Sequence, residues 1–256
     1  MENHEDVDKL FFELASESRI DILRELNAKS WKMNALARKL DLTTTETFRQ
    51  LQRLGKTSFV SKDVNGFYGL TPFGKLVLFL SPSFDFILKY RQYFLDHDVW
   101  GLPSEFIFRI GELSNGVLEA NFFDGVKMIE EIIASAEDYI WTMTSQVLAP
   151  HGRVVEERLR GGVKFRSLHP EGMLPVELDY SEFGDCIERR YLPKTPVIIV
   201  ITGKKACVSF PFFGDNLDYM AFFAEDPNFM KWTTDLYLHY WQHGEVLRKN
   251  TKTSRK

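Results

Sequence analysis

The stretch 43–74 reads TTTETFRQLQRLGKTSFVSKDVNGFYGLTPFG and joins the signal of a helix to that of a β-hairpin. Thr43 or Thr44 can cap the helix, because a hydroxyl that precedes a helix accepts hydrogen bonds from its free backbone N–H groups. Asn65-Gly66 is a turn-forming pair between two apolar segments, which is a strong signal of a hairpin. The expected elements are a helix from 43 or 44 to about 54, strands at 59–62 and 67–70, and a helix at 73–80.

Three short helices are expected upstream of this stretch. They lie at 10–15, from Ser16 to about Asn27, and at 33–40, each with apolar residues at helical spacing. A tight turn at 41–43 leads into the fourth helix, where Glu46 occupies a capping-box position and Gly55 fits a C-terminal cap. A helix pair joined by a tight turn and followed by a hairpin predicts a winged helix-turn-helix.

The fourth helix is predicted to have a packing face and a reading face. At about 100° per residue, Thr44, Phe48 and Leu51 fall on one side, which we expect to pack inward. The opposite side carries arginine and glutamine, whose side chains suit guanine and adenine edges in the major groove. The alternative is that this side merely solvates a surface helix. Together with the hairpin, the residues predicted to contact double-stranded DNA are Thr43, Thr45, Glu46, Arg49, Gln50, Arg53, Lys62 and Asn65.

The charge distribution supports the same interpretation. The chain of 256 residues has a formal net charge of −4, which argues against nonspecific nucleic-acid binding by the molecule as a whole. The segment 29–75 nevertheless contains nine basic residues against three acidic ones, a local balance of +6. A compact basic island on such a scaffold is typical of a surface that faces phosphates.

The remainder of the chain is expected to hold a helical junction and an α/β domain with an at least partly parallel sheet. Aromatic residues at Phe84, Tyr90, Phe94 and Phe106 make the junction a candidate homodimer seam, and packing between two domains of one chain is the equal alternative. The expected elements are strands at 118–123, 139–143, 163–168, 197–201 and 206–210, and helices at 125–137, 154–160 and 228–246. The predicted domains are a DNA-binding domain at 1–80, the junction at 81–115, the α/β domain at 116–248 and a basic tail at 249–256.

Two of the expected strands end in polar runs, which predicts an effector pocket. Ligands of open α/β sheets bind beyond the carboxyl ends of the strands, so side chains after strands 139–141 and 163–165 would face each other across a crevice. Such a crevice suits a small anionic or polyhydroxylated metabolite. The competing interpretation is that these residues cap strand ends. The candidate effector residues are Thr142, Thr144, Ser145, Gln146, Arg166 and His169.

Several motifs resemble known regulators. Tyr68, Leu70, Thr71 and Gly74 match the closing Y-x-L-T-x-x-G segment of ArsR-type winged-helix regulators, which the stretch 43–74 resembles. The metal-sensing cysteines of the arsenic branch are absent, which removes metal sensing through the third helix but not DNA binding.

The later segments GVKMIEEIIASAEDYIWTMTS, RLRGGVKFRSL and PVIIVITGKKACVSFP resemble a phospholipase-D-like fold. The whole chain is similar to the archaeal methanogenesis-regulator (filament-regulator) family, and more distantly to TrmB-like regulators. This resemblance implies a transcriptional regulator of mixed α+β class, in which a catalytically degenerate phospholipase-D-like α/β sandwich follows the winged helix.

The catalytic pattern of phospholipase D is missing. That chemistry needs H-x-K-x4-D, in which one histidine attacks phosphorus and another protonates the leaving group. His151 is followed by Gly-Arg and His169 by Pro-Glu, and the segment 192–196, where the motif is expected, reads LPKTP. We therefore predict no enzyme activity and no cofactor. The alternatives are a phosphodiester or nucleotide hydrolase with a divergent site tethered to nucleic acid, and a protein-interaction adaptor.

Metal, disulfide and membrane signals are weak. His239 and His243 are spaced for a shared metal, but their aromatic neighbours and the lack of an adjacent glutamate favour packing. Cys186 and Cys207 lie 21 residues apart and form neither a disulfide framework nor a paired-thiolate metal site. No segment approaches the roughly 18 to 20 apolar residues of a membrane span, and the acidic start is unlike a secretory signal. A cytoplasmic location with no membrane partner is expected.

Overall fold

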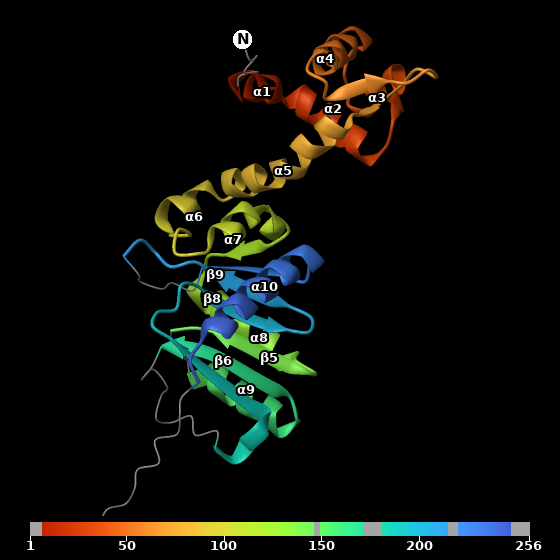
Figure 1. Cartoon of the computed structure of the whole chain (residues 1–256). Coiled ribbons are helices and arrows are strands. Elements are labelled where there is room, and N and C mark those ends of the chain that lie inside the picture. Colours follow the sequence, from red (N-terminus) through yellow and green to blue (C-terminus); the bar gives the residue numbers. More distant parts are fainter. Residues whose placement is uncertain (1–6, 146–148, 171–180, 215–219, 247–256) are drawn as a thin grey trace, which may run out of the picture. The chain divides into compact units, whose positions relative to one another are not determined.

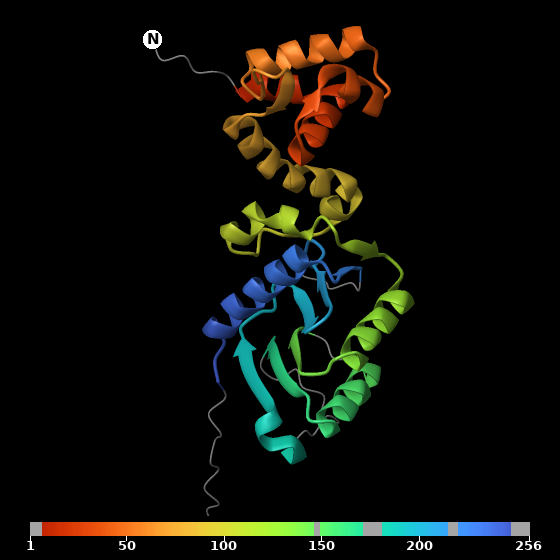
Figure 2. The ribbon, with the colours of Figure 1, turned by 90° about the vertical axis from the view of Figure 1, so that its right-hand side faces the viewer.

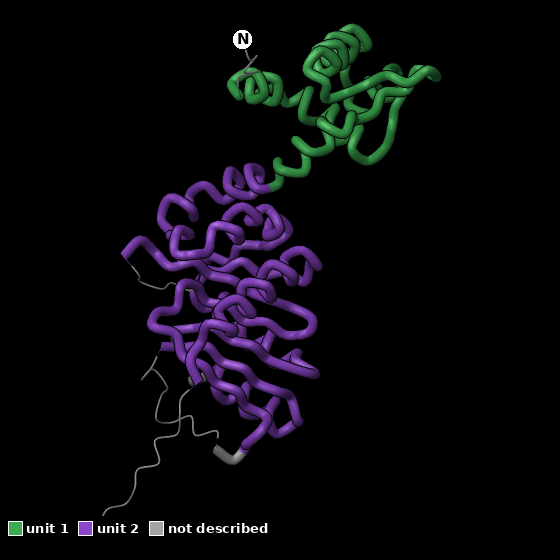
Figure 3. Tube along the Cα trace, viewed as in Figure 1, with its two compact units in different colours: residues 1–82 green, residues 83–256 purple. Residues whose placement is uncertain are grey.

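The computed structural model describes residues 7–145, 149–170, 181–214 and 220–246 (Figure 1). The chain divides into two compact units, unit 1 at residues 1–82 and unit 2 at residues 83–256 (Figure 3). Helix α5 (Pro72–Lys89) belongs to both, whereas the sequence predicted a helix that ends at 80 and a second one after Pro82. The helix continues because the Ser81 hydroxyl donates to the Leu78 carbonyl (2.9 Å), the group that Pro82 cannot serve without an N–H.

Unit 1 consists of helices around a small antiparallel sheet. Its elements are α1 (Val7–Leu14), α2 (Glu17–Ala28), β1 (Trp31–Lys32), α3 (Met33–Lys39), α4 (Thr44–Lys56), β2 (Val60–Lys62) and β3 (Phe67–Leu70), followed by α5. The strand order is β1-β3-β2, and β1, which the sequence did not predict, pairs Trp31 with Tyr68. The core consists of buried residues from α2, α3, α4 and the start of the hairpin, namely Ile22, Leu23, Leu26, Leu36, Leu51, Leu54, Phe59 and Val60.

The packing face of α4 differs from the predicted one. Thr47, Leu51 and Leu54 are buried, whereas Thr44 is exposed and Phe48 is 43% exposed. Thr47 tolerates burial because its hydroxyl donates to the Thr43 carbonyl at 3.0 Å, so no polar group is left unpaired. The predicted face of Thr44, Phe48 and Leu51 is therefore wrong in part, because Thr47 and Leu54 are buried in place of Thr44 and Phe48.

The end of α4 and the start of α5 are fixed by close backbone contacts. The helix ends at Thr57 and not at the predicted Gly55 cap, and Ser58 adopts the left-handed conformation (φ 61°). The Thr71 hydroxyl accepts from the Gly74 N–H at 3.0 Å and caps α5. A Cβ on Gly74 would lie 2.2 Å from the Phe59 carbonyl oxygen, so this position requires glycine.

Unit 2 is built on one seven-stranded sheet with the order β4-β10-β9-β8-β5-β6-β7. Its elements after α5 are α6 (Arg91–Asp96), α7 (Ser104–Phe108), η1 (Ile110–Leu113), β4 (Val117–Glu119), α8 (Phe122–Ala134), β5 (Tyr139–Met143), α9 (Ala149–Arg160), β6 (Lys164–Pro170), η2 (Ser181–Cys186), β7 (Ile187–Leu192), β8 (Ile198–Thr202), β9 (Ala206–Ser209), β10 (Ala221–Ala224) and α10 (Pro227–His243). Strands β5, β6 and β7 pair in parallel and the other pairs are antiparallel, which confirms a partly parallel sheet. Strands β7 and β10 were not predicted, and the strand expected at 118–123 ends at Glu119 because Asn121 caps α8.

The sheet of unit 2 lies between two helical layers. Figure 2 shows α10 on one side of the strands and α8 with α9 on the other. Leu236 and Tyr237 of α10 pack in one buried cluster with Met143 and Leu168, while Ile133 of α8 belongs to the second cluster. Alternate residues of each strand therefore serve two separate cores.

The predicted dimer seam is largely part of the unit 2 core. Phe106 is buried, and the Trp232 indole N–H donates to its carbonyl at 3.0 Å. Tyr90 and Phe94 are half-buried and pack against the same cluster. Phe84 is 56% exposed. Most aromatic residues of the junction thus pack within unit 2. Their number in the sequence did not distinguish such packing from a dimer surface.

Candidate nucleic-acid interface

The exposed face of α4 is a stripe formed by Thr45, Arg49, Gln52 and Lys56. Their spacing of four, three and four residues places them in one row along the helix, opposite the buried face. Within the described residues, Arg49, Gln52 and Lys56 make no hydrogen bond or ion pair. Thr45 and Arg49 of this stripe were expected from the sequence, whereas Gln52 and Lys56 were not, because the expected packing face differed from the one observed.

The start of α4 is firmly positioned. The Thr43 hydroxyl accepts from the Glu46 N–H at 3.1 Å, which confirms Thr43 as the N-cap. The turn before it places Asp41 in the left-handed region (φ 53°), a conformation that a short polar side chain tolerates. The Leu42 N–H then donates to the Ala37 carbonyl at 2.9 Å. Helices α3 and α4 are thereby joined by a tight, fully bonded turn.

Three predicted DNA-contacting residues contact neighbouring helices instead. Arg53 donates twice to the Glu13 carboxylate, from Nε to Oε2 at 3.1 Å and from Nη2 to Oε1 at 2.6 Å. The Gln50 side-chain oxygen accepts from Arg19 at 3.2 Å, and the Glu46 carboxylate accepts from the Ser18 hydroxyl at 3.2 Å. The prediction treated the whole polar side of α4 as open, but α1 and α2 occupy part of it.

These contacts form a small charged network. Arg19 is buried and also donates to the backbone carbonyls of Glu13 and Phe12. The hydrogen bond from Arg53 holds the pKa of Glu13 below its usual value, against the opposing effect of burial. The network therefore fixes α4 against α1 and α2 on one side, while the polar stripe of four residues stays directed to solvent.

The hairpin presents the other two predicted residues. Lys62 is exposed on β2 with its ammonium 5.5 Å from the centre of the Tyr68 ring, and Asn65 is exposed in the turn. The Asp63 carboxylate accepts from the backbone N–H of Asn65 (2.9 Å) and of Phe67 (2.8 Å). Because Asp63 is engaged in the turn, the tip of the hairpin is held by its own backbone contacts.

The predicted effector crevice does not form. Trp141 lies opposite Arg166 in the β5–β6 ladder and Thr142 lies opposite Ser167, so Thr142 and His169 face α8 and α9 while Arg166 faces the α10 side. Residues separated by an odd number of positions on one strand cannot share a face, which the prediction overlooked. Thr144 and Ser145 are half-buried after β5, and Gln146 lies outside the described residues.

The histidines of unit 2 make packing and backbone contacts. His169 is 3% exposed, and its Nδ1 donates to the Pro170 carbonyl at 3.0 Å. The His151 Nε2 lies 3.2 Å from the Val126 carbonyl. Burial lowers the pKa of both rings, so both are neutral at pH 7.

The two histidines of α10 that were considered as metal ligands, His239 and His243, also pack against neighbouring side chains. His239 and His243 lie 4.7 Å apart between ring centres, and Glu105 of α7 is 3.8 Å from the His239 ring. Among the residues that the structure describes, no three side chains of histidine, cysteine, aspartate or glutamate gather as metal ligands. The same residues include no helix that is both long and apolar enough to cross a membrane.

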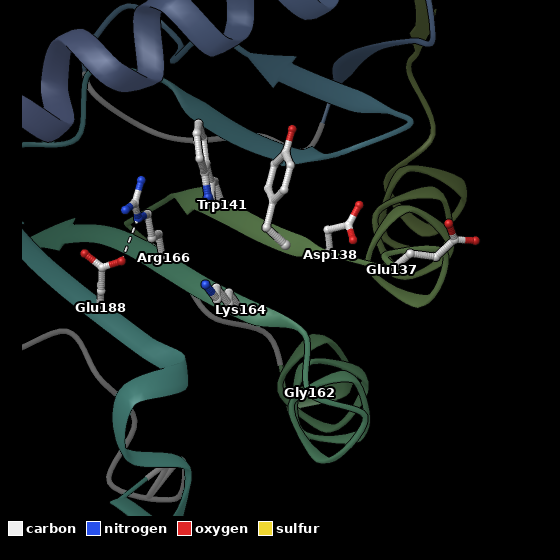
Figure 4. Close-up of a pocket in the computed structure, with 8 residues that line it drawn as sticks. Glu137, Asp138, Trp141, Gly162, Lys164, Arg166 and Glu188 are labelled. Atoms are coloured by element: carbon white, nitrogen blue, oxygen red, sulfur yellow. Dashed lines mark hydrogen bonds and ion pairs between the residues drawn. The ribbon is translucent and has the colours of Figure 1, made fainter.

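A hollow of about 500 Å³ lies on the α10 side of the sheet, at the amino ends of β5 and β6 (Figure 4). It is lined by Glu137, Asp138, Tyr139, Trp141, Gly162, Lys164, Arg166 and Glu188. Of the five predicted effector residues that the structure describes, Arg166 alone lines it. The other lining residues were not predicted, because they come from three separate segments of the chain. Which of their side chains share one face of the sheet depends on the register of the strand pairing.

Comparison with solved structures finds likenesses at low sequence identity, three of which are described here. TrmBL2, an archaeal chromatin protein with a novel mode of DNA binding, has a TM-score of 0.44 at 14% identity over 91% of this chain and 94% of its own. NucT from Helicobacter pylori has a TM-score of 0.42 at 10% identity over 52% of this chain and 98% of its own. The phospholipase D family member Nuc from Salmonella typhimurium has a TM-score of 0.39 at 14% identity over 48% and 91%. No protein family and no curated protein matches the sequence. With TM-scores below 0.5, the case for function rests on this chain's own residues.

Proposed function

We propose that the chain is a DNA-binding transcriptional regulator whose unit 1 is a winged helix-turn-helix. The observation that carries the proposal is the exposed stripe of Thr45, Arg49, Gln52 and Lys56 on α4, which lies opposite the buried face of the helix and makes no side-chain hydrogen bond or ion pair within the described part of the chain. Arginine and glutamine match guanine and adenine edges, and lysine and threonine match phosphates. Helix α4 would lie in the major groove with this stripe toward the bases.

The hairpin extends the same surface. Lys62 and Asn65 are exposed beyond the end of α4, where a wing meets the flanking backbone or the minor groove. The local charge balance of +6 over 29–75 provides the sequence-independent attraction to phosphates. Because Glu46, Gln50 and Arg53 are bonded to α1 and α2, we assign them to supporting the helix and not to base contact.

We further propose that the regulator binds DNA as a homodimer. One winged helix covers a short site, and a two-fold protein matches a pseudo-palindromic operator. Within unit 1, α5 exposes a row of apolar side chains, Leu76 at 58%, Phe79 at 78% and Leu80 at 58%. An exposed apolar row of this kind is typical of an interface, and it replaces the predicted aromatic seam.

Titration of labelled duplex DNA with the full chain tests the proposal. We expect sequence-selective binding. The logarithm of the association constant should fall linearly with the logarithm of the salt concentration, because phosphate contacts release counterions. Changing Lys56 to alanine should weaken binding to all duplexes alike and reduce the salt slope by about one. Binding that is absent, or that is unchanged in this variant and in R49A, would contradict the proposal.

A further inference from the structure

The hollow in unit 2 has the dimensions of a small-molecule site. Its volume of about 500 Å³ lies within the range of roughly 300 to 1,000 Å³ that is usual for ligand pockets. All of its lining residues belong to unit 2. At Gly162 (φ +85°) no atom lies within 4 Å of where a Cβ would stand, so the rim beside β6 is open. The site is therefore accessible to a ligand from solvent.

An aromatic wall forms one side of the hollow. The rings of Tyr139 and Trp141 lie 4.8 Å apart, and their spacing of two residues on β5 places both on the α10 side of the sheet. Figure 4 shows Trp141 at this wall. Trp141 is held between the Tyr237 ring at 5.2 Å and the Arg166 guanidinium at 5.3 Å. Burial, and then the charge of Asp138, raises the pKa of Tyr139, so its hydroxyl stays protonated at neutral pH. The wall is preorganised to stack a planar group.

The five charged residues that line the hollow fall into two classes. Arg166 is paired with Glu188 at 2.9 Å, and Glu137 is paired with Lys204. By contrast, neither the Asp138 carboxylate nor the Lys164 ammonium has a hydrogen-bond or ion-pair partner within the described residues. The Arg166–Glu188 pair stabilises the sheet edge. The unpaired Asp138 and Lys164 remain available to a ligand.

The two available charges lie next to Tyr139, because Asp138 directly precedes it in the chain and Lys164 begins the neighbouring strand β6. Lys164 is the ladder partner of Tyr139, and its backbone N–H donates to the Asp138 carbonyl at 3.0 Å. One negative and one positive group thus stand beside a single aromatic ring without neutralising each other. A ligand that carries only negative charge would meet the unpaired carboxylate of Asp138, and one that carries only positive charge would meet the unpaired ammonium of Lys164.

We propose that this hollow binds a zwitterionic α-amino acid with a planar or apolar side chain. The ligand carboxylate pairs with Lys164, its ammonium group pairs with Asp138, and its side chain stacks on Tyr139. Each contact is a charge-assisted hydrogen bond or an aromatic contact. The inference concerns binding alone, and its test contains no DNA, so it can fail or hold separately from the proposed regulatory function.

Isothermal titration of the full chain with L-tryptophan, L-phenylalanine and L-leucine tests the inference. Tryptamine, which lacks the carboxylate, and indole-3-propionate, which lacks the ammonium group, serve as matched ligands. We expect an aromatic amino acid to bind, and both analogues to bind at least about tenfold more weakly. Asp138→Asn and Lys164→Ala should each lower the affinity for the amino acid by a similar factor, with Lys164→Arg retaining most of it.

Lys127→Ala, on the exposed side of α8, is the control for loss of a surface lysine and should bind like the wild type. Equal affinity for tryptamine or indole-3-propionate would overturn the zwitterion assignment. Retained affinity in both Asp138→Asn and Lys164→Ala would show that the amino acid binds elsewhere. Absence of heat with every amino acid at millimolar concentration would overturn the proposal as a whole.

Discussion

Replacement of Arg49 by alanine should separate DNA affinity from stability. The Arg49 guanidinium is exposed and makes no contact within the described residues, and alanine has the highest helix propensity. We therefore expect the free energy of unfolding to change by less than about 0.5 kcal/mol. A lost bidentate contact to guanine is worth about 1 to 3 kcal/mol, so the dissociation constant of a cognate duplex should rise about 5- to 150-fold for each bound protomer.

The matched control is Arg53→Ala on the same helix. Arg53 holds the Glu13 carboxylate through two hydrogen bonds, so its loss should destabilise unit 1, while direct contacts of folded protein with DNA are retained. Fluorescence anisotropy with labelled duplex would report affinity, and hydrogen exchange of peptides from residues 7–82 would report the stability of unit 1 in the full chain.

The two variants should therefore show opposite patterns. If R53A loses DNA affinity with unchanged exchange protection while R49A binds like the wild type, the assignment of the α4 faces is wrong. An equal loss of affinity in both variants with no change in exchange would refute it as well.

Three further predictions concern stability and chemistry. Because the pKa of Glu13 is lowered in the folded state, the ionised carboxylate stabilises unit 1 above the ordinary glutamate pKa of about 4.3, and this stabilisation is lost as pH falls through the folded pKa. In E13Q, the stability of unit 1 measured by hydrogen exchange should lose this contribution to its acid dependence. Gly74→Ala should destabilise unit 1 by about 1 to 3 kcal/mol or more through the clash with the Phe59 carbonyl, whereas Gly55→Ala, whose Cβ meets nothing closer than 3.8 Å, should be neutral or stabilising in denaturant titrations. The purified chain should release no product from phosphatidyl, cyclic-nucleotide or oligonucleotide phosphodiesters, and turnover that disappears in H151A or H169A would favour the hydrolase alternative.

The N-terminal elements could be predicted from the sequence because their signals are local. The Thr43 cap, the Asn65-Gly66 turn and the Thr71-x-x-Gly74 segment each act within a few residues, and the structure places helices and strands accordingly. The face of α4 could not be predicted as well, because the burial of Thr47 depends on a bond to its own backbone and the contacts of Arg53 depend on α1.

The hollow in unit 2 could not be predicted from the sequence, for a different reason. Strand β7 reads IERRYL, and a run of charges at a sheet edge lacks the alternation that identifies a strand. Without β7 and its register, Glu188 cannot be assigned to the face of Arg166. The placement of Arg166 and His169 on opposite faces was, by contrast, available from the period of two along β6.

The most direct test of the central claim is to select preferred DNA sequences from a random duplex pool with the wild-type chain and with Arg49→Ala, Gln52→Ala and Gln50→Ala. If the exposed stripe of α4 reads DNA, the wild type selects a defined motif, R49A and Q52A each lose preference at particular base pairs, and Q50A selects the wild-type motif. A motif that changes in Q50A and stays intact in both R49A and Q52A, or a wild-type chain that selects no motif, would contradict the account.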